Sequence, residues 1–414
     1  MERYYDEKEV RTPEERKRDL SMQLVRMISN GYEKSTRLRE IFREFNVTPS
    51  DFSSIDDLHK LPVISREKVV LYESEDPPYG GFAAPDVMPE RVFISPGPVY
   101  EPHLKEYSLW ARGYCASGFS ARDIVLNTFS YHMVAAGLTF HEGLRAAGAT
   151  VVPSGTSNTE QQVRLIKDLR ITAFTGTPSF LMAIIKKAEE SGYDFKRDFM
   201  IRRACFVAEP LQPTLREIFE NEYGIDTYQM YGATEVGDIA YECREKKDWH
   251  VVEDAIVEIV DPATGGCVQP GELGEVVVTR LNDVFYLLRF GTGDLSSMLN
   301  LRCSCGRTSQ KLCGIAGRVG DAVKVRGMFI TKGQLARVQE TFAGVRLQAV
   351  ITRRSYKDVL RIEVEASMGG EKLKDDITDE FKKVCTVSVD EIDFVPAGTI
   401  TENAPRIIDR REWE

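Results

Sequence analysis

The first part of the chain carries apolar residues at helical spacing among many charged ones. Pro13 opens a strongly charged run in which Leu24, Met27 and Ile28 recur at the three- and four-residue intervals that place side chains on one helix face. The charged positions between them belong on the solvated side of such a helix. The pattern predicts a helical and polar segment from the N-terminus to about residue 75.

From residue 123 onward, short apolar runs alternate with amphipathic ones. Strands that alternate with helices in this way form a parallel sheet covered by helices. The expected strands are 123–126, 150–152, 173–175, 203–207 and 227–230, and the expected helices are 134–147, 158–169, 178–191 and 215–223.

The pattern changes after residue 250. Short alternating strands, separated by turns rich in Pro and Gly, predict a β-rich subdomain over about residues 251–312. Beyond Gly317 the pattern predicts a small α+β unit. Its expected elements are helices at 333–341 and 371–384 and strands at 349–351 and 360–365.

Length sets the number of domains. A chain of 414 residues exceeds one compact core and suggests about two or three domains. We therefore expect an α/β protein. Its large N-terminal domain covers residues 1–316, with parallel sheets, helices and the β-rich subdomain, and its small α+β C-terminal domain covers residues 317–414.

Composition narrows the class of protein. Hydrophobic residues make up 42% of the chain and charged residues 29%, which excludes a disordered or fibrous chain. A formal net charge of -10 argues against a nucleic-acid partner, because neutralising phosphates requires a surplus of Lys and Arg. Apolar runs fall short of the ~18 to 20 residues of a membrane span, and the N-terminus lacks the apolar core of a secretory signal. We expect a cytoplasmic protein with no membrane partner.

Acidic residues close to glycine lie at or near the ends of predicted strands. Glu235 ends the segment 231–235 (YGATE) after a strand, where open α/β sheets bind ligands, and its carboxylate suits Mg²⁺ beside a nucleotide triphosphate. A turn with a solvated Glu gives the same pattern. Asp294 in 289–294 (RFGTGD) suits ribose hydroxyls, and a β-turn is the alternative reading. The segment 207–210 (VAEP) has small residues that admit a flat base.

In this order and spacing, these segments resemble the adenylate-forming superfamily, and more narrowly the phenylacetate-coenzyme A ligase family. The matching segments extend over nearly the whole chain. They are Leu61-Pro62, 127–148 with His141, 158–162, 177–179, 208–210, 231–235, Glu242-Cys243, His250, Glu253-Asp254, Gly317-Arg318 and Arg326-Gly327.

The resemblance implies a two-step reaction. A small carboxylic acid, of the aryl or arylacetic kind, is activated with ATP to an acyl-adenylate with release of pyrophosphate. Coenzyme A then accepts the acyl group and AMP leaves. The C-terminal domain is expected to rotate as a mobile lid between the two half-reactions, and the chain is expected to form a homodimer.

The resemblance also implies roles for residues of this chain. Thr234 and Glu235 hold phosphate and Mg²⁺, and Asp294 binds the ribose. The other expected nucleotide-binding residues are Ser95, Gly97, Ala208, Glu209, Pro210, Tyr231, Gly232, Ala233 and Arg307. The expected acid-binding residues are Tyr131, His132, Val134 and Ala135, and the expected catalytic cations are Arg318, Lys324, Arg326 and Arg406.

The chain departs from the family's pattern where pyrophosphate leaves. The family's phosphate loop is rich in hydroxyls and Gly and carries a Lys, but residues 95–102 read SPGPVYEP, so prolines remove N–H donors and Glu101 replaces a cation. Residues 398–409 contain no Lys where the family has a catalytic one, and Arg406 is the nearest cation. Gly320 stands where the family usually has a hinge Asp. One lost electrostatic group costs ~10² to 10³ in rate, so we expect slow adenylation.

Some of the cysteines lie close to one another in the sequence. Cys303 and Cys305 form a C-x-C-G motif, and Cys243 is followed by His250. These four residues supply the ligands of a closed, tetrahedral structural Zn²⁺ site. Cys313 is a substitute fourth ligand, and scattered thiols without a metal are the alternative reading.

Three functions fit the sequence. The first is an ATP-dependent acyl- or aryl-coenzyme A ligase. The second is an adenylyltransferase resembling the deazaflavin-adenylating synthetases, whose product is the adenylate itself. The third is a nucleotide- or coenzyme-A-binding relative with impaired adenylation. Pyrophosphate exchange, with and without transfer to coenzyme A, separates them.

Overall fold

A computed structural model describes residues 4–95, 98–103, 109–325, 328–354, 357–366, 370–385, 387–401 and 404–411. Within these ranges the chain divides into two compact units. Unit 1 comprises Met1–Glu258, Val277–Thr292 and Met298–Cys313, and unit 2 comprises Ile259–Val276, Gly293–Ser297 and Gly314–Glu414. The domain boundary expected between residues 316 and 317 stays a prediction.

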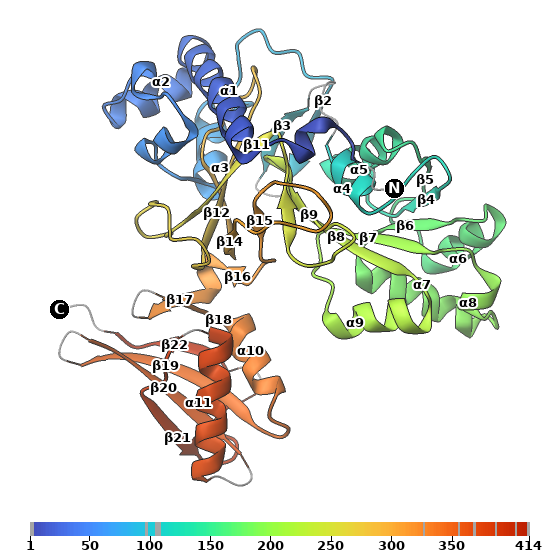
Figure 1. Ribbon diagram of the computed structural model, residues 1–414, viewed down its shortest axis with the longest axis vertical. Coiled ribbons are helices and arrows are strands. Elements are labelled where there is room, and N and C mark those ends of the chain that lie inside the picture. The colour runs from blue at the N-terminus through green and yellow to red at the C-terminus, as the bar shows by residue number, and fades with distance from the viewer. Residues whose placement is uncertain are drawn as a thin grey trace. The chain divides into compact units, whose positions relative to one another are not determined.

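The N-terminal segment of unit 1 is helical, as predicted. Its helices are α1 (Pro13–Lys34), α2 (Thr36–Glu44) and α3 (Arg66–Glu75), with 3-10 turns at Glu7–Val10, Pro49–Asp51 and Ile55–Lys60 (Figure 1). Thr12 and Glu15 form a capping box that begins α1. Leu24, Met27 and Ile28 are buried, which confirms the predicted apolar face.

A large mixed sheet runs through unit 1 in the order β14-β15-β10-β9-β8-β7-β6-β4-β5 (Figure 1). The strands from β4 to β8 are parallel, and β9, β10, β14 and β15 extend the sheet antiparallel. This confirms the predicted parallel sheet. The bounds are β4 (Ile124–Asn127), β5 (Thr150–Pro153), β6 (Ala173–Gly176), β7 (Arg203–Phe206), β8 (Asp226–Ala233), β9 (Gly237–Tyr241), β10 (Trp249–Val251), β14 (Met298–Leu299) and β15 (Lys311–Leu312).

Helices between these strands bury the apolar faces that the sequence predicts. Leu126, Phe174 and Phe206 from the sheet pack with Leu181 and Ile185 from α7 in one buried cluster. The helix expected at 215–223 consists of a short α-helix that continues as a π-helical turn at Ile218–Glu222. The helices are α4 (Ala111–Ala116), α5 (Ala135–Ala146), α6 (Thr159–Asp168), α7 (Pro178–Glu190), α8 (Phe195–Asp198) and α9 (Pro213–Glu217).

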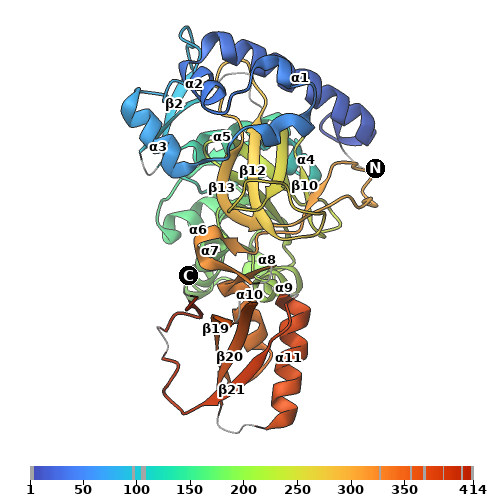
Figure 2. The ribbon, with the colours of Figure 1, turned by 90° about the vertical axis from the view of Figure 1, so that its left-hand side faces the viewer.

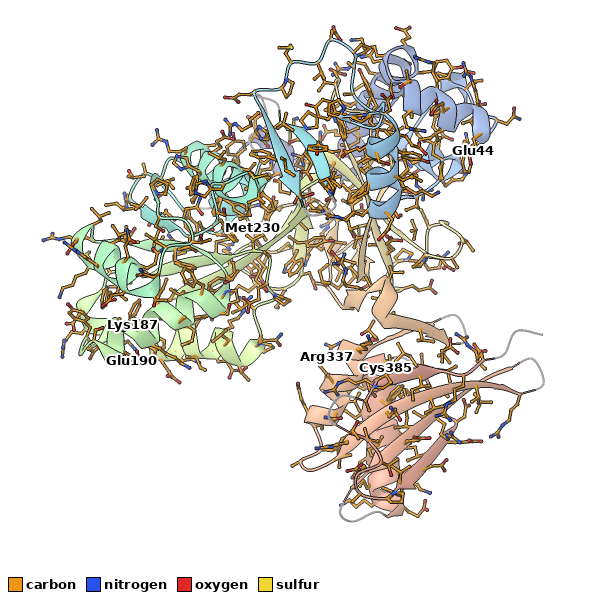
Figure 3. All side chains as sticks on the ribbon, turned by 180° about the vertical axis from the view of Figure 1, so that it is seen from behind. Glu44, Lys187, Glu190, Met230, Arg337 and Cys385 are labelled. Carbon is orange, nitrogen blue, oxygen red and sulfur yellow. The ribbon has the colours of Figure 1, made fainter. Side chains whose placement is uncertain are left out.

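The strand β8 is longer than predicted. It continues through Tyr231, Gly232 and Ala233, because these residues pair antiparallel with β9 and only Thr234 to Val236 form the turn. The sequence pattern had placed this segment in a turn after the strand. Met230 on β8 is buried, whereas Glu190 at the end of α7 is exposed (Figure 3).

The remaining strands form smaller sheets. One sheet has the order β1-β13-β12-β11, with β16 paired to β13, and a hairpin joins β2 to β3. The expected phosphate loop lies in this hairpin, so Ser95 ends one strand and Glu101 lies within the other. The bounds are β1 (Ile64–Ser65), β2 (Arg91–Ser95), β3 (Val99–His103), β11 (Ala255–Val260), β12 (Gly274–Arg280), β13 (Phe290–Ser296) and β16 (Gly317–Arg318).

The part of unit 2 that follows β16 is an α+β structure, as predicted. A sheet of order β21-β20-β19-β22 carries α11 along one face (Figure 2). Ile351, Ile362, Phe381 and Cys385 share its buried core. The bounds are β17 (Ala322–Val325), β18 (Met328–Thr331), α10 (Lys332–Glu340), β19 (Arg346–Arg354), β20 (Lys357–Glu365), α11 (Glu371–Cys385), β21 (Glu391–Val395) and β22 (Ile407–Asp409).

Among the described residues, no helix is both long and apolar enough to cross a bilayer.

Candidate active site

A cavity of about 230 Å³ lies in unit 1 beside the end of β8. Its walls are mainly aromatic and aliphatic, with a few polar groups gathered among them, as in typical small-molecule sites. The apolar lining is Phe93, Leu109, Trp110, Phe129, Ala135, Ala136, Phe140, Val207, Val236, Phe285 and Leu287. The polar side chains are Glu101, His103, Thr139, Thr234, Glu235, Arg280 and Asn282.

Backbone from β8 and β9 forms another part of the wall. A Cβ at Gly232 would lie 2.3 Å from the carbonyl oxygen of Gly237 and 2.5 Å from Cη2 of Trp110. A residue without a side chain is therefore required where the indole approaches the hairpin. The Trp110 backbone N–H donates to Asp238 on β9 over 3.0 Å, and the indole N–H donates to the Thr139 hydroxyl over 3.2 Å.

Arg66 connects the turn after β8 to the hairpin β2–β3. One terminal nitrogen of its guanidinium lies 2.7 Å from Oε1 of Glu235, and the other donates to the Ser95 hydroxyl over 2.9 Å. Ser95 in turn donates to Oε1 of Glu101 over 3.0 Å. Glu73 on α3 accepts a hydrogen bond from the Tyr100 backbone at the same hairpin. Carboxyl groups from three separate segments thus gather around one arginine.

Burial changes the acidity of these carboxyl groups. Burial and then the negative charge of Glu235 raise the pKa of Glu101 from 4.5 to about 9. Burial likewise raises the pKa of Glu73 to about 7. Both causes favour the neutral carboxylic acid form of Glu101 over its carboxylate.

Several residues expected from the sequence line this cavity together. Ala208 has a positive φ of 69° at the end of β7, where the strand gives way to the segment expected to border adenine. Of the residues expected to bind the acid, Ala135 at the start of α5 lines the cavity. The expected residues in the lining are Ala135, Ala208, Gly232, Ala233, Thr234 and Glu235.

Other expected residues have different neighbours, and among the described residues they are not in the cavity lining. The Tyr131 hydroxyl accepts from Asn127 and contacts His141, and His132 is exposed. The Tyr231 hydroxyl donates to Thr292. Val134, Glu209 and Pro210 are likewise outside the lining. Their predicted roles stay predictions.

The expected residues of unit 2 form contacts of their own. Arg318 lies 3.3 Å from Asp294, opposite it in the pairing of β13 with β16. Arg406 donates to Gln339 on α10. Lys324 belongs to β17, and Gly97 and Arg326 lie outside the described residues.

Arg307, which the family resemblance places beside the nucleotide, has its contacts with the N-terminal segment. Arg307 is buried and donates to Oε1 of Glu9, itself fully buried, over 2.7 Å. Tyr241 donates to the same oxygen, and Tyr4 donates to the carbonyl of Cys305 beside it. The positive guanidinium balances the charge of the Glu9 carboxylate, and this ion pair joins the N-terminal segment to the loop 302–309. Among the described residues Arg307 is not in the cavity lining, and its predicted role beside the nucleotide stays a prediction.

The clustered cysteines and one histidine meet at the antiparallel end of the large sheet. The potential ligand atoms of Cys243, His250, Cys303 and Cys305 all lie within 4.8 Å of one another. The sulfur atoms of Cys243 and Cys303 are 3.7 Å apart, and Sγ of Cys305 is 3.4 Å from Nε2 of His250. Cys313 is exposed and does not belong to this group.

The spacing of these atoms fits a tetrahedral metal. Two thiolates bound to Zn²⁺ at ~2.3 Å are about 3.8 Å apart in a tetrahedron, which matches the separation of Cys243 and Cys303. The other ring nitrogen of His250 is 3.3 Å from the Ser309 hydroxyl, a contact of the kind that orients a metal-bound imidazole.

Sequence reasoning missed the contribution of Arg66 and the buried position of Glu101. Arg66 begins α3, far from β8 in sequence, and the preceding strand β1 pairs with β13 in a different sheet from β8. The signal for Glu101 was weak, because an isolated Glu between prolines is usually solvated.

Comparisons with known proteins identify the family. The family described as "AMP-binding enzyme" matches residues 104–282. The chain is 30% identical to the phenylacetate-coenzyme A ligase of Aromatoleum evansii over 426 residues, which cover 95% of each chain. The chain belongs to the phenylacetate-coenzyme A ligase family. It is also 29% identical to the enzyme of that name from Thermus thermophilus, over 89% of this chain and 86% of the relative.

A solved structure supports the fold. A crystal structure described as an open conformation of 2-hydroxyisobutyryl-CoA ligase, in complex with 2-HIB-AMP and CoA, superposes with a TM-score of 0.87. The match covers 97% of this chain and 93% of the other at 22% identity. The predicted α/β fold of the phenylacetate-coenzyme A ligase family is confirmed.

The buried pair of Arg307 and Glu9 leads to a stability prediction. Arg307→Ala leaves the Glu9 carboxylate buried without its cation, which should cost ~3 to 5 kcal/mol of unfolding free energy, while the KM for ATP of the folded enzyme stays unchanged. Urea unfolding and ATP kinetics measure the two effects. Arg302→Ala is the matched control, since Arg302 is exposed on the same loop. Unchanged stability of Arg307→Ala with a tenfold higher KM for ATP would instead support the predicted role of Arg307 beside the nucleotide.

Proposed function

We propose that this protein is an AMP-forming acyl- or aryl-coenzyme A ligase. In the first step a carboxylate oxygen of the acid attacks the α-phosphorus of ATP, and pyrophosphate leaves. In the second step the thiolate of coenzyme A attacks the acyl carbon, and AMP leaves. The observation that carries the proposal is the placement of Gly232, Ala233, Thr234 and Glu235 at the wall of an apolar cavity.

The cavity walls support an aromatic acid as substrate. The rings of Trp110 and Phe140 are 4.5 Å apart and edge-to-face, and Phe129 lies 4.6 Å from Phe140. Such a wall binds a flat apolar group by burial and ring packing. An aryl or arylacetic acid would place its ring there and direct its carboxylate toward Thr234 and Glu235.

Glu235 and Arg66 supply the polar end of the site. Oxygen ligands suit Mg²⁺, so the Glu235 carboxylate and the Thr234 hydroxyl are the groups that would hold it, and bound Mg²⁺ would offset phosphate charge. Arg66 places a guanidinium beside Glu235 and Ser95, where the sequence lacks the expected loop lysine. A guanidinium can bind phosphate oxygens through two N–H groups at once.

Pyrophosphate exchange with a panel of aryl, arylacetic and small aliphatic acids tests the proposal. We expect exchange with at least one acid and formation of its thioester when coenzyme A is added. Glu235→Gln should lower the exchange rate ~10²- to 10³-fold, because the metal and phosphate lose a charged partner. Glu190→Gln, at the exposed end of α7, is the matched control and should exchange at the normal rate (Figure 3).

The outcomes separate the three functions that fit the sequence. Exchange without thioester formation would favour an adenylyltransferase. Nucleotide binding without exchange by any acid would favour a relative that has lost adenylation. A normal exchange rate for Glu235→Gln would contradict the role given to the turn after β8.

We also propose that the four-residue cluster holds one structural Zn²⁺. Cys243 lies in the connection between β9 and β10, His250 lies in β10, and Cys303 and Cys305 lie in the loop between β14 and β15. Four protein ligands leave no open position for water, so the metal would fasten two loops without taking part in the reaction. The first of these loops follows β9, the partner of β8, and the second precedes β15, the partner of β10.

Elemental analysis of protein purified without added metal should find one zinc per chain. Cys303→Ser should remove most of it and lower the melting temperature, because metal binding contributes to folding. Cys313→Ser is the matched control, since this thiol is exposed. This variant should keep the zinc content and the melting temperature of the wild-type protein. Zinc far below one per chain, with a melting temperature that a chelator leaves unchanged, would exclude the site.

A further inference from the structure

Glu101 is a buried acid whose position the proposed reaction does not yet explain. It lies in β3 opposite Phe93, is 6% exposed and lines the cavity together with Thr234 and Glu235. Within the described residues, its Oε2 atom has no hydrogen-bond partner. A buried polar atom without a protein partner is costly unless a ligand satisfies it.

The hydrogen bonds around Ser95 decide which oxygen of Glu101 carries a proton. A guanidinium can only donate, so the Ser95 hydroxyl oxygen accepts from Arg66. The hydroxyl hydrogen of Ser95 is then available to Glu101, and it points to Oε1 over 3.0 Å. Oε1 is therefore an acceptor, and a neutral Glu101 carries its proton on Oε2.

We propose that Glu101 is a neutral carboxylic acid whose Oε2–H donates a hydrogen bond to an anionic oxygen of the substrates, either the carboxylate of the acid or a phosphate of the nucleotide. This inference rests on the proposed ligase function. It names a substrate-binding residue at a position where the chain departs from the family's pattern.

The charges around Glu101 support a neutral form. Glu73 on α3 and Glu235 after β8 act on it with negative charge, whereas Arg66 is the positive group that offsets them in part. Burial further disfavours the carboxylate, and the pKa of Glu101 is raised to about 9. A second carboxylate here would repel anionic substrates, while a protonated one replaces a donor that the prolines of the loop cannot supply.

The pH dependence of pyrophosphate exchange tests this role. A group with a raised pKa keeps its proton at neutral pH and loses it as the pH approaches that value. The wild-type rate should therefore fall tenfold per pH unit above about pH 9. Glu101→Gln, which keeps a neutral N–H donor, should stay within about threefold of wild type at pH 7 and lose the alkaline fall. Glu101→Ala should lose ~10²-fold at pH 7.

Calorimetry with separate ligands identifies the anion. Weaker binding of AMP and ATP to Glu101→Ala assigns the hydrogen bond to phosphate, and weaker binding of the acid assigns it to the carboxylate. Unchanged affinity for all of them overturns the proposal. So does a Glu101→Gln variant that is as slow as Glu101→Ala while melting like wild type, because a carboxylate would then be required.

An infrared measurement keeps this inference separate from the ligase function. At pH 7 the wild-type protein should show the carbonyl stretch of a protonated carboxyl group, and Glu101→Gln should lack that component. If none of the acids supports pyrophosphate exchange by the wild-type protein, the ligase function fails. The infrared band still decides whether Glu101 is neutral. Absence of the band overturns the proposal.

Discussion

The close contact between β8 and β9 at Gly232 is the constraint on which the site depends. There the parallel sheet meets its antiparallel extension, and the carbonyl of Gly237 and the ring of Trp110 occupy the space that a side chain would need. The hairpin therefore ends in a short turn that presents Thr234 and Glu235 to the cavity, with Trp110 as the adjoining wall. The proposed zinc site would stabilise the same region from the other side of β9.

A second feature follows from this geometry, because the turn places Glu235 close to other acids. Like charges in a dry site raise each other's pKa until one of them is neutral or a cation intervenes. Here Arg66 provides the cation beside Glu235, and the neutral form that we propose for Glu101 would let the cluster face anionic substrates. The phosphate loop of this chain lacks a lysine, and the arginine and the neutral acid together form a different solution to the same electrostatic problem.

The sequence allowed the α/β architecture to be predicted because each element of the parallel sheet carries its own local pattern. The strand at 124–127 is apolar on both faces, and α6 and α7 begin at the capping residues Asn158 and Thr177. Four residues of the YGATE segment, Gly232 to Glu235, also line the cavity. Pairing between distant segments was not predictable in this way, since the length of β8 depends on β9, which follows it.

The same limitation applies to contacts between the predicted site residues and distant segments. The family resemblance implies that Arg307 lies beside the nucleotide. Its partner in the structure is Glu9, which is almost 300 residues away in sequence, and no local pattern joins the two. Arg66 belongs to none of the recognised sequence motifs, although its guanidinium contacts Glu235 and Ser95, two of the residues expected to bind the nucleotide. Ion pairs of this kind become visible only when the fold is known.

Isotope transfer tests the central claim, that this site forms an acyl-adenylate, most directly. An acid labelled with ¹⁸O in its carboxylate is incubated with ATP and coenzyme A, and the nucleotide product is analysed by mass spectrometry. If the acid oxygen attacks the α-phosphorus, AMP recovered after thioester formation carries one ¹⁸O atom. Thioester formation with unlabelled AMP, or with the label in inorganic phosphate and ADP as the nucleotide product, would contradict the account.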